Sequence, residues 1–164
     1  MNIEEIKKEI DRASYIVITT HKSPDGDAIG SSLGLYHYLK NKGKEVVVIV
    51  PDAFPDFLKW MPLSSDIVYF DKDKEIAEKH IGMSDLIFSL DYNALSRIGE
   101  LGEVIGESKA NKIVIDHHQN PQEFANHYYV DTDCCSTAQL IYEFINELGD
   151  IDSLTKEIAE CLYC

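Results

Sequence analysis

The sequence predicts an α/β fold in which a mostly parallel sheet of five or more strands carries helices on both faces. Short apolar segments alternate along the chain with longer segments of helical period. Such an alternation is typical of βαβ units with right-handed crossovers. Most of the apolar segments also lack a polar face, as expected for parallel strands that are buried on both sides.

Five segments are predicted as strands because each is apolar and bounded by turn-forming or charged residues. They are Tyr15–Thr20, Glu45–Val50, Ile67–Phe70, Asp85–Leu90 and Lys112–Ile115. Six segments with helical period are predicted as helices: Ile3–Ala13, Ser31–Lys42, Lys74–His80, Arg97–Ser108, Ser136–Leu148 and Ser153–Tyr163. Gly43 follows the second helix as its C′ residue, and Ser136 or Thr137 is expected to cap the fifth.

Length and charge indicate one globular domain that is not a membrane protein. The chain has 164 residues, with 15 basic and 29 acidic side chains and a net charge of −14. No apolar run reaches the ~18 residues of a membrane span, and the N-terminus does not resemble a signal peptide. We therefore expect a cytoplasmic protein. Its acidity argues against binding long duplex nucleic acid, although short nucleotides held through metal ions and a homodimer are both compatible with it.

The four cysteines do not indicate a metal or redox site. Cys161 and Cys164 form a CxxC pair, which occurs in redox centres and in zinc sites. A zinc site of this kind needs a second pair, and none is present. We expect packed or free thiols in a reducing compartment.

Three predicted strands end in side chains that bind metal ions. The first is followed by a His-x-x-x-Asp-Gly-Asp segment, the second by one aspartate and the third by Asp-His-His. These candidates are His21, Asp25, Asp27, Asp91, Asp116, His117 and His118. Because ligands of open parallel sheets lie outside the carboxyl ends of the strands, we expect the candidates to converge there.

The candidate ligands indicate two divalent cations. All are carboxylates or imidazoles, which suit Mn²⁺, Fe²⁺ or Mg²⁺ better than structural zinc. Four aspartates carry a charge that two divalent ions would compensate, and Asp91, from a central strand, is the best candidate for a bridging ligand. Two ions about 3.5–4 Å apart generate hydroxide at neutral pH and stabilise in-line displacement at phosphorus.

The segment after the first motif favours a phosphate ligand. Residues 28–32, with small side chains, are predicted to open a helix whose N–H groups and dipole face the metal site. Ser31 is a candidate substrate contact there. A helix end that merely packs on the sheet, with serine as its cap, is an equally good interpretation.

Together, HKSPDGDAIGSS, the strand that ends in Asp91, and VIDHHQNP resemble the DHH phosphoesterase superfamily. The resemblance covers essentially the whole chain. It implies that His21 and Asp25 bind one Mn²⁺, that Asp27 and His117 bind the other, and that Asp91 bridges them. Mg²⁺, Co²⁺ or Fe²⁺ are alternative ions.

The resemblance also implies roles in catalysis. His118 would contact the scissile phosphate, and Asp116 would orient an imidazole beside the bridging Asp91. The segment DYNALSRIG resembles oligoribonuclease-type members, in which an Arg-x-Gly follows the bridging aspartate. Arg97 is therefore a candidate phosphate ligand, although a solvated arginine explains it as well. Pyrophosphatases usually place histidine where Tyr92 stands.

The expected function is Mn²⁺-dependent hydrolysis of short oligoribonucleotides and of 3′-phosphoadenosine 5′-phosphate. The alternatives are a pyrophosphatase or exopolyphosphatase, a phosphodiesterase for cyclic-dinucleotide products, and a module that binds metal and nucleotide without turnover. Members of the family carry a further metal-binding aspartate and a C-terminal DHHA1 domain that binds substrate. We expect residues 1–164 to form the DHH domain and to end before both.

Overall fold

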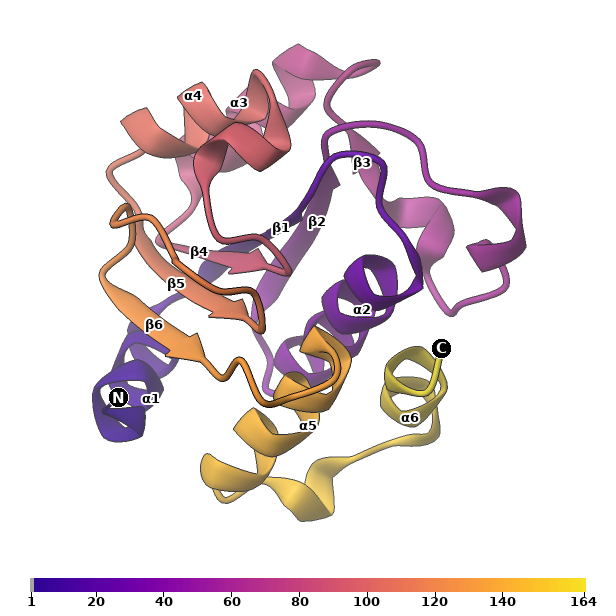
Figure 1. Cartoon of the computed structure of the whole chain (residues 1–164), viewed down its shortest axis with the longest axis vertical. Coiled ribbons are helices and arrows are strands. Elements are labelled where there is room, and N and C mark those ends of the chain that lie inside the picture. The colour runs from indigo at the N-terminus through magenta and orange to yellow at the C-terminus, as the bar shows by residue number, and fades with distance from the viewer. Residues whose placement is uncertain (1) are drawn as a thin grey trace.

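The computed structural model describes residues 2–164 and contains a wholly parallel, six-stranded sheet (Figure 1). Its strands are β1 (Tyr15–Thr20), β2 (Glu45–Val50), β3 (Val68–Tyr69), β4 (Leu86–Leu90), β5 (Asn111–Asp116) and β6 (His127–Val130). They lie in the order β3-β2-β1-β4-β5-β6. The direction of the order reverses between β1 and β4, and ligands of doubly wound sheets bind at such a point.

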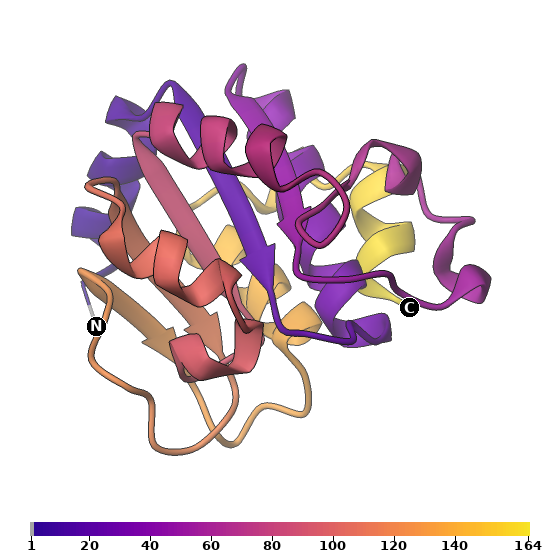
Figure 2. The ribbon, with the colours of Figure 1, turned by 90° about the horizontal axis from the view of Figure 1, so that it is seen from above.

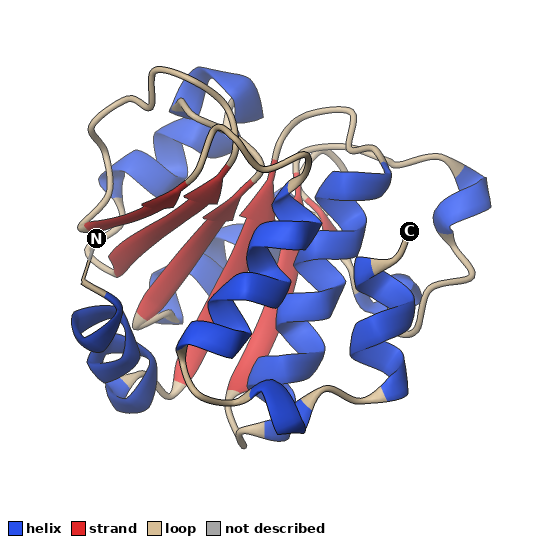
Figure 3. Cartoon of the chain, turned by 60° about the horizontal axis from the view of Figure 1, so that its bottom comes forward, coloured by secondary structure: helices blue, strands red, loops and turns tan. Residues whose placement is uncertain are grey.

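Helices cover both faces of the sheet, which confirms the predicted fold class (Figures 2 and 3). They are α1 (Ile3–Arg12), α2 (Gly26–Asn41), α3 (Lys74–Met83), α4 (Leu101–Glu107), α5 (Thr137–Glu147) and α6 (Lys156–Leu162). One core cluster contains buried side chains of α1, α2, α5 and α6, and the other contains those of α3 and α4. In β1, Ile16 and Ile18 belong to the first cluster and Val17 to the second, which explains why this strand has no polar face.

The start of α2 differs from the prediction. The helix begins at Gly26, five residues before the expected Ser31, because the carboxylate of Asp25 accepts a hydrogen bond from the Ala28 N–H at 3.1 Å. A candidate metal ligand is thus also a helix N-cap. In α5 the prediction holds, since Ser136 is the cap and accepts from the Gln139 N–H at 3.1 Å.

Other boundaries also differ from the prediction. The helix expected over residues 97–108 is divided into a 3₁₀ turn at Leu95–Ile98 and α4, because Gly99 adopts φ +60° and ψ −137°. The predicted strand over 67–70 pairs over only two residues in β3, and the final helix begins at Lys156 after its cap, Thr155. The edge strand β6, which the sequence analysis did not include, is short and half-buried.

The length and polarity of the helices and the pairing of the cysteines bear on two classes of protein, those that span membranes and those held by disulfides. Across residues 2–164, every helix is too short or too polar to span a bilayer. The four cysteines are free thiols, with Cys161 buried and Cys164 exposed.

One side chain joins the starts of the two central strands. The Asp85 carboxylate accepts hydrogen bonds from the N–H groups of Ser14 and Tyr15, at 2.8 and 2.9 Å. These bonds lower the pKa of Asp85. The carboxylate therefore stabilises the fold at any pH above its unfolded pKa of about 3.9, and this contribution is lost as the pH falls through the lower folded value.

We expect Asp85→Asn to lower the free energy of unfolding by about 1 kcal/mol at pH 7, a modest loss because the carboxylate is exposed and screened. Urea unfolding at pH 7 and pH 3 measures it. The difference between variant and wild type should shrink at pH 3, where the wild-type carboxylate is becoming protonated. A difference independent of pH would contradict the assignment.

Candidate metal centre

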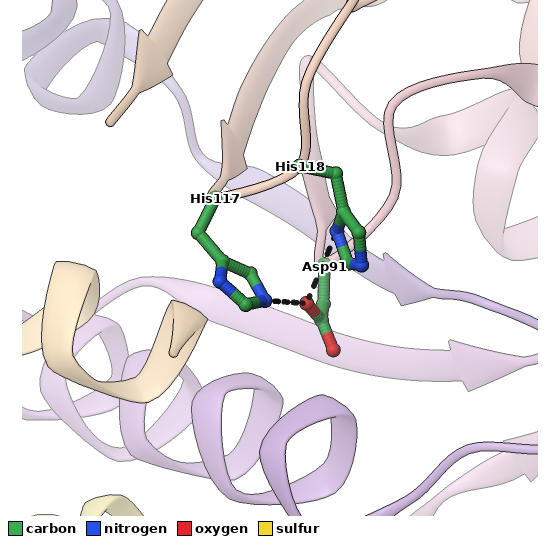
Figure 4. A group of neighbouring side chains, drawn as sticks. All are labelled: Asp91, His117 and His118. Carbon is green, nitrogen blue, oxygen red and sulfur yellow. Dashed lines mark ion pairs between the residues drawn. The ribbon is translucent and has the colours of Figure 1, made fainter. Parts of the chain in front are cut away.

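The carboxyl ends of β1, β4 and β5 bring the candidate ligands together. His21 and Asp91 directly follow β1 and β4, and Asp116 is the last residue of β5. These strands are neighbours in the sheet, with β4 in the middle. Of the remaining candidates, Asp25 is the N-cap of α2, Asp27 lies in the first turn of that helix, and His117 and His118 are the two residues after β5. Figure 4 shows three members of the group: Asp91, His117 and His118.

Asp91 lies at the centre of the group. It is 2% exposed, and each of its carboxylate oxygens faces a different histidine. Oδ2 is 3.4 Å from Nε2 of His21. Oδ1 is 3.5 Å from Nε2 of His117, the contact drawn in Figure 4. Its backbone is left-handed, with φ +62°, a conformation that aspartate tolerates better than most residues. The turn after β4 thereby aims one carboxylate at two separate partners.

Backbone carbonyls set the tautomers of His21 and His117. Nδ1 of His21 lies 2.8 Å from the carbonyl of Lys22, and Nδ1 of His117 lies 3.3 Å from that of Cys134. A carbonyl can only accept, so each Nδ1–H donates. In a neutral ring this leaves the Nε2 lone pair free, and both Nε2 atoms point toward Asp91. Metal-binding histidines in proteins are commonly oriented in this way.

The spacing of these atoms fits cations. His21 Nε2 is 3.9 Å from Asp25 Oδ1, and His117 Nε2 is 3.7 Å from Asp27 Oδ2. These separations exceed ordinary hydrogen bonds, whereas two ligands each about 2.1 Å from one ion lie roughly 3–4 Å apart. Asp91 belongs to two groups of possible ligands, and within each group the ligand atoms lie within 4.8 Å of one another. One group adds His21 and Asp25, and the other adds His117 and His118. The donor set therefore fits two divalent cations.

Asp27 is held by the N-terminus of α5. Its Oδ2 accepts from the N–H of Thr137 at 2.8 Å, and its Oδ1 accepts from that of Ala138 at 2.7 Å. Burial, together with the nearby charge of Asp91, raises the pKa of Asp27. Asp27 thus joins the first turn of α2 to the N-terminus of α5, with its Oδ2 3.7 Å from Nε2 of His117.

His118 and Asp116 form a hydrogen-bonded pair. Nδ1 of His118 donates to Oδ1 of Asp116 at 2.7 Å and lies 3.8 Å from Asp91. Asp116 is fully buried, and its Oδ2 has no hydrogen-bond partner within residues 2–164. The His118 side chain is 40% exposed. Because Nδ1 is engaged by Asp116, Nε2 is the atom of His118 that is available to a ligand.

The charges of His21 and Asp91 support each other. Contact with the Asp91 carboxylate raises the pKa of His21 despite its burial. Burial by itself would raise the pKa of Asp91, but the His21 imidazole 3.4 Å away and the hydrogen bond from Thr137 lower it overall. Asp91 is consequently ionised in the folded protein, as a metal ligand must be.

Thr137 has a role that its sequence pattern did not predict, since the pattern indicated only an alternative helix cap. In the structure Ser136 is the cap, and the buried Thr137 hydroxyl donates to Oδ1 of Asp91 at 2.9 Å. Since the Thr137 N–H also binds Asp27, one residue orients two candidate ligands. The only indication in the sequence was a second hydroxyl directly after the cap.

We expect Thr137→Val to weaken metal binding about 10- to 100-fold, because residues that orient metal ligands contribute on this scale. Valine has a similar shape but cannot donate to Asp91. Isothermal titration with Mn²⁺ measures the change, and Thr137→Ser, which keeps the hydroxyl, should retain most of the affinity. Equal affinities for the serine and valine variants would show that the hydroxyl has no such role.

The two other candidate substrate contacts lie differently. Ser31 is fully buried in the second turn of α2, and its hydroxyl donates to the Ala28 carbonyl at 3.2 Å. Arg97 is exposed, and its carbonyl accepts from the Lys22 N–H at 3.0 Å, which places its segment beside the metal loop. The substrate role of each residue stays a prediction, and this geometry is more favourable for Arg97.

Comparison with known proteins identifies the family. Residues 15–164 match the model for the DHH family, N-terminal domain. The chain belongs to the DHH family. This confirms the resemblance carried by the three motifs, and it assigns the chain to the DHH phosphoesterase superfamily.

Several relatives of this DHH domain are enzymes. It is 33% identical over 150 residues to the bifunctional oligoribonuclease and PAP phosphatase NrnA of Thermus thermophilus, covering 90% of this chain and 40% of that protein. It is 25% identical over 165 residues to the cyclic-di-AMP phosphodiesterase PdeA of Listeria monocytogenes, covering 96% and 25%. The crystal structure of an exopolyphosphatase-related protein from Bacteroides fragilis superposes with a TM-score of 0.97 and 48% identity, covering 98% and 47%. The chain therefore spans less than half the length of these relatives.

Proposed function

We propose that this DHH domain carries the metal centre of a phosphoesterase that hydrolyses short oligoribonucleotides and 3′-phosphoadenosine 5′-phosphate with two Mn²⁺ ions. The observation that carries the proposal is the position of Asp91, whose two oxygens face His21 and His117 separately. This is the arrangement that a carboxylate shared by two cations requires. Such a pair of ions supplies Lewis-acid activation of water and offsets negative charge on a phosphate.

Each residue then has a defined task. His21 and Asp25 would hold one ion, Asp27 and His117 the other, and Asp91 both. These three aspartates, together with Asp116, keep the site strongly negative until cations bind. His118 would hold the phosphate or transfer a proton through Nε2, because its Nδ1–H is fixed by Asp116.

The choice of substrate rests on relatives and on Tyr92. The NrnA protein with 33% identity is named as an oligoribonuclease and PAP phosphatase. Tyr92 is fully buried, and its hydroxyl lies 2.8 Å from that of Thr19 and donates to that of Ser89 at 2.7 Å. It therefore cannot take the place of the histidine that pyrophosphatases have after the bridging aspartate. This disfavours pyrophosphate as the substrate.

The test compares a 5′-phosphorylated diribonucleotide, 3′-phosphoadenosine 5′-phosphate and inorganic pyrophosphate, each with Mn²⁺, by chromatography and phosphate release. We expect cleavage of the first two only. Cleavage of pyrophosphate alone would overturn the proposal. The linear dinucleotide pApA tests the alternative of a phosphodiesterase for cyclic-dinucleotide products, and preference for it over other diribonucleotides would favour that alternative.

Silence on every substrate while Mn²⁺ still binds would have a different meaning. It would favour the alternative of a module that binds metal without turnover. The hydrolysis proposed here would then be wrong for this chain.

A further inference from the structure

A cavity of about 400 Å³ lies beside the metal centre, outside the carboxyl ends of β1, β2 and β3. Its volume is within the range of small-molecule sites, about 300–1,000 Å³. Side chains that follow these three strands line it, together with residues near the starts of α3 and α4. The lining includes Lys22, Asp52, Phe70, Asp71, Lys74 and Ile98.

The cavity and the metal centre are joined through the loop after β1. His21 contributes Nε2 to the metal centre, and the next residue, Lys22, lines the cavity. Asp52, which also lines the cavity, accepts a hydrogen bond from the Ser23 N–H at 2.6 Å. Ser23 has a left-handed backbone, with φ +54°. One short loop therefore places a ligand of the metal centre and a wall of the cavity next to each other.

The position of the cavity in the sheet indicates what it binds. In doubly wound sheets of this strand order, a nucleotide lies across the point where the order reverses, and an acidic residue after the second strand binds ribose hydroxyls. Asp52 is the second residue after β2, and Asp71 is the second residue after β3. Both line the cavity, on the β2 side of the reversal between β1 and β4.

The chemistry of the lining agrees with this position. Phe70 and Ile98, which are 5% and 0% exposed, lie beneath the cavity and give it an apolar floor. Among the described residues, the Asp71 carboxylate has no hydrogen-bond or ion-pair partner, so it is free to accept from hydroxyl groups. Lys74 is paired with Glu100 at 3.1 Å, whereas Lys22 has no ion-pair partner within residues 2–164. Lys22 is therefore the lining cation available to a phosphate.

We propose that this cavity binds the nucleoside of a ribonucleotide whose phosphate is held at the neighbouring metal centre. The inference rests on the proposed function, which it deepens by making ribose a recognised part of the substrate. The base occupies the cavity above its apolar floor, Asp71 accepts from the ribose hydroxyls, and Lys22 faces the phosphate between the cavity and the ions.

Binding measurements on the full chain test this inference without requiring turnover. The probes are AMP, 2′,3′-dideoxy-AMP and inorganic phosphate, titrated calorimetrically in the presence of Mn²⁺. We expect AMP to bind at least about tenfold more tightly than the dideoxynucleotide, the effect of losing hydrogen bonds to a charged group. Asp71→Ala should remove this preference and leave phosphate binding unchanged. Lys22→Met should weaken AMP about tenfold.

Lys109→Met is the matched control, because Lys109 lines a different cavity, formed by α3, α4 and the loop after α4. It should bind all three probes as wild type does. Equal binding of AMP and the dideoxynucleotide by wild type, or an unchanged preference in Asp71→Ala, would overturn the inference. Failure of the proposed function is distinguishable, since it appears as absent Mn²⁺-dependent hydrolysis. Hydrolysis with the same KM for ribo- and deoxyribonucleotides would contradict ribose recognition by the cavity but would leave the proposed function intact.

Discussion

Asp91→Asn is expected to abolish binding of both metal ions and, with it, hydrolysis. The amide keeps the size of the carboxylate and can still accept from Thr137, but it loses the charge that faces His21 and His117. Because one carboxylate serves both candidate sites, both should fail together, with a loss in affinity of roughly 100-fold or more. Titration with Mn²⁺ measures this directly.

The fold should tolerate this substitution. Residue 91 has a left-handed backbone, and asparagine adopts that conformation as readily as aspartate. Asp85→Asn is the matched control, since it makes the same chemical change at the other end of β4, away from the metal centre. It should bind two ions as wild type does. Two wild-type isotherms for Asp91→Asn would show that Asp91 is not a shared ligand.

His118→Ala is expected to separate hydrolysis from metal binding. Nδ1 of His118 is engaged by Asp116, so the ring is placed to act on the substrate through Nε2. Loss of a group that transfers a proton or holds the phosphate typically lowers the rate about 100- to 10,000-fold. Steady-state hydrolysis of the diribonucleotide measures the rate, and titration with Mn²⁺ should remain within a few-fold of wild type.

Metal titration decides between two roles for His118. One ring nitrogen of His118 lies close enough to Asp91 and His117 for the three residues to form a possible ligand group. If His118→Ala loses one of two binding events, His118 is a metal ligand and the assignment of the second site to Asp27 is wrong. His117→Ala, which removes a ligand in either case, provides the comparison because it should always lose that event.

The sequence by itself determined the fold class and the strand ends that carry chemistry. Continuous apolar segments such as Tyr15–Thr20 cannot have a wet face, so they had to be buried between helices. Parallel strands place all their carboxyl ends at one edge, and this brought His21, Asp91 and His117 to one place before any contact was known. Local patterns also located most helices, since periodicity and caps depend on neighbours in the chain.

Only the tertiary structure decided how each candidate side chain is used. Asp25 caps α2, Asp27 binds the N-terminus of α5, and Asp116 is paired with His118. Thr137 approaches Asp91 although the two lie 46 positions apart. Composition and spacing specify which donors and acceptors exist. Their pairing depends on how α2 and α5 pack against the sheet, which is a property of the whole core and is not encoded by any local pattern.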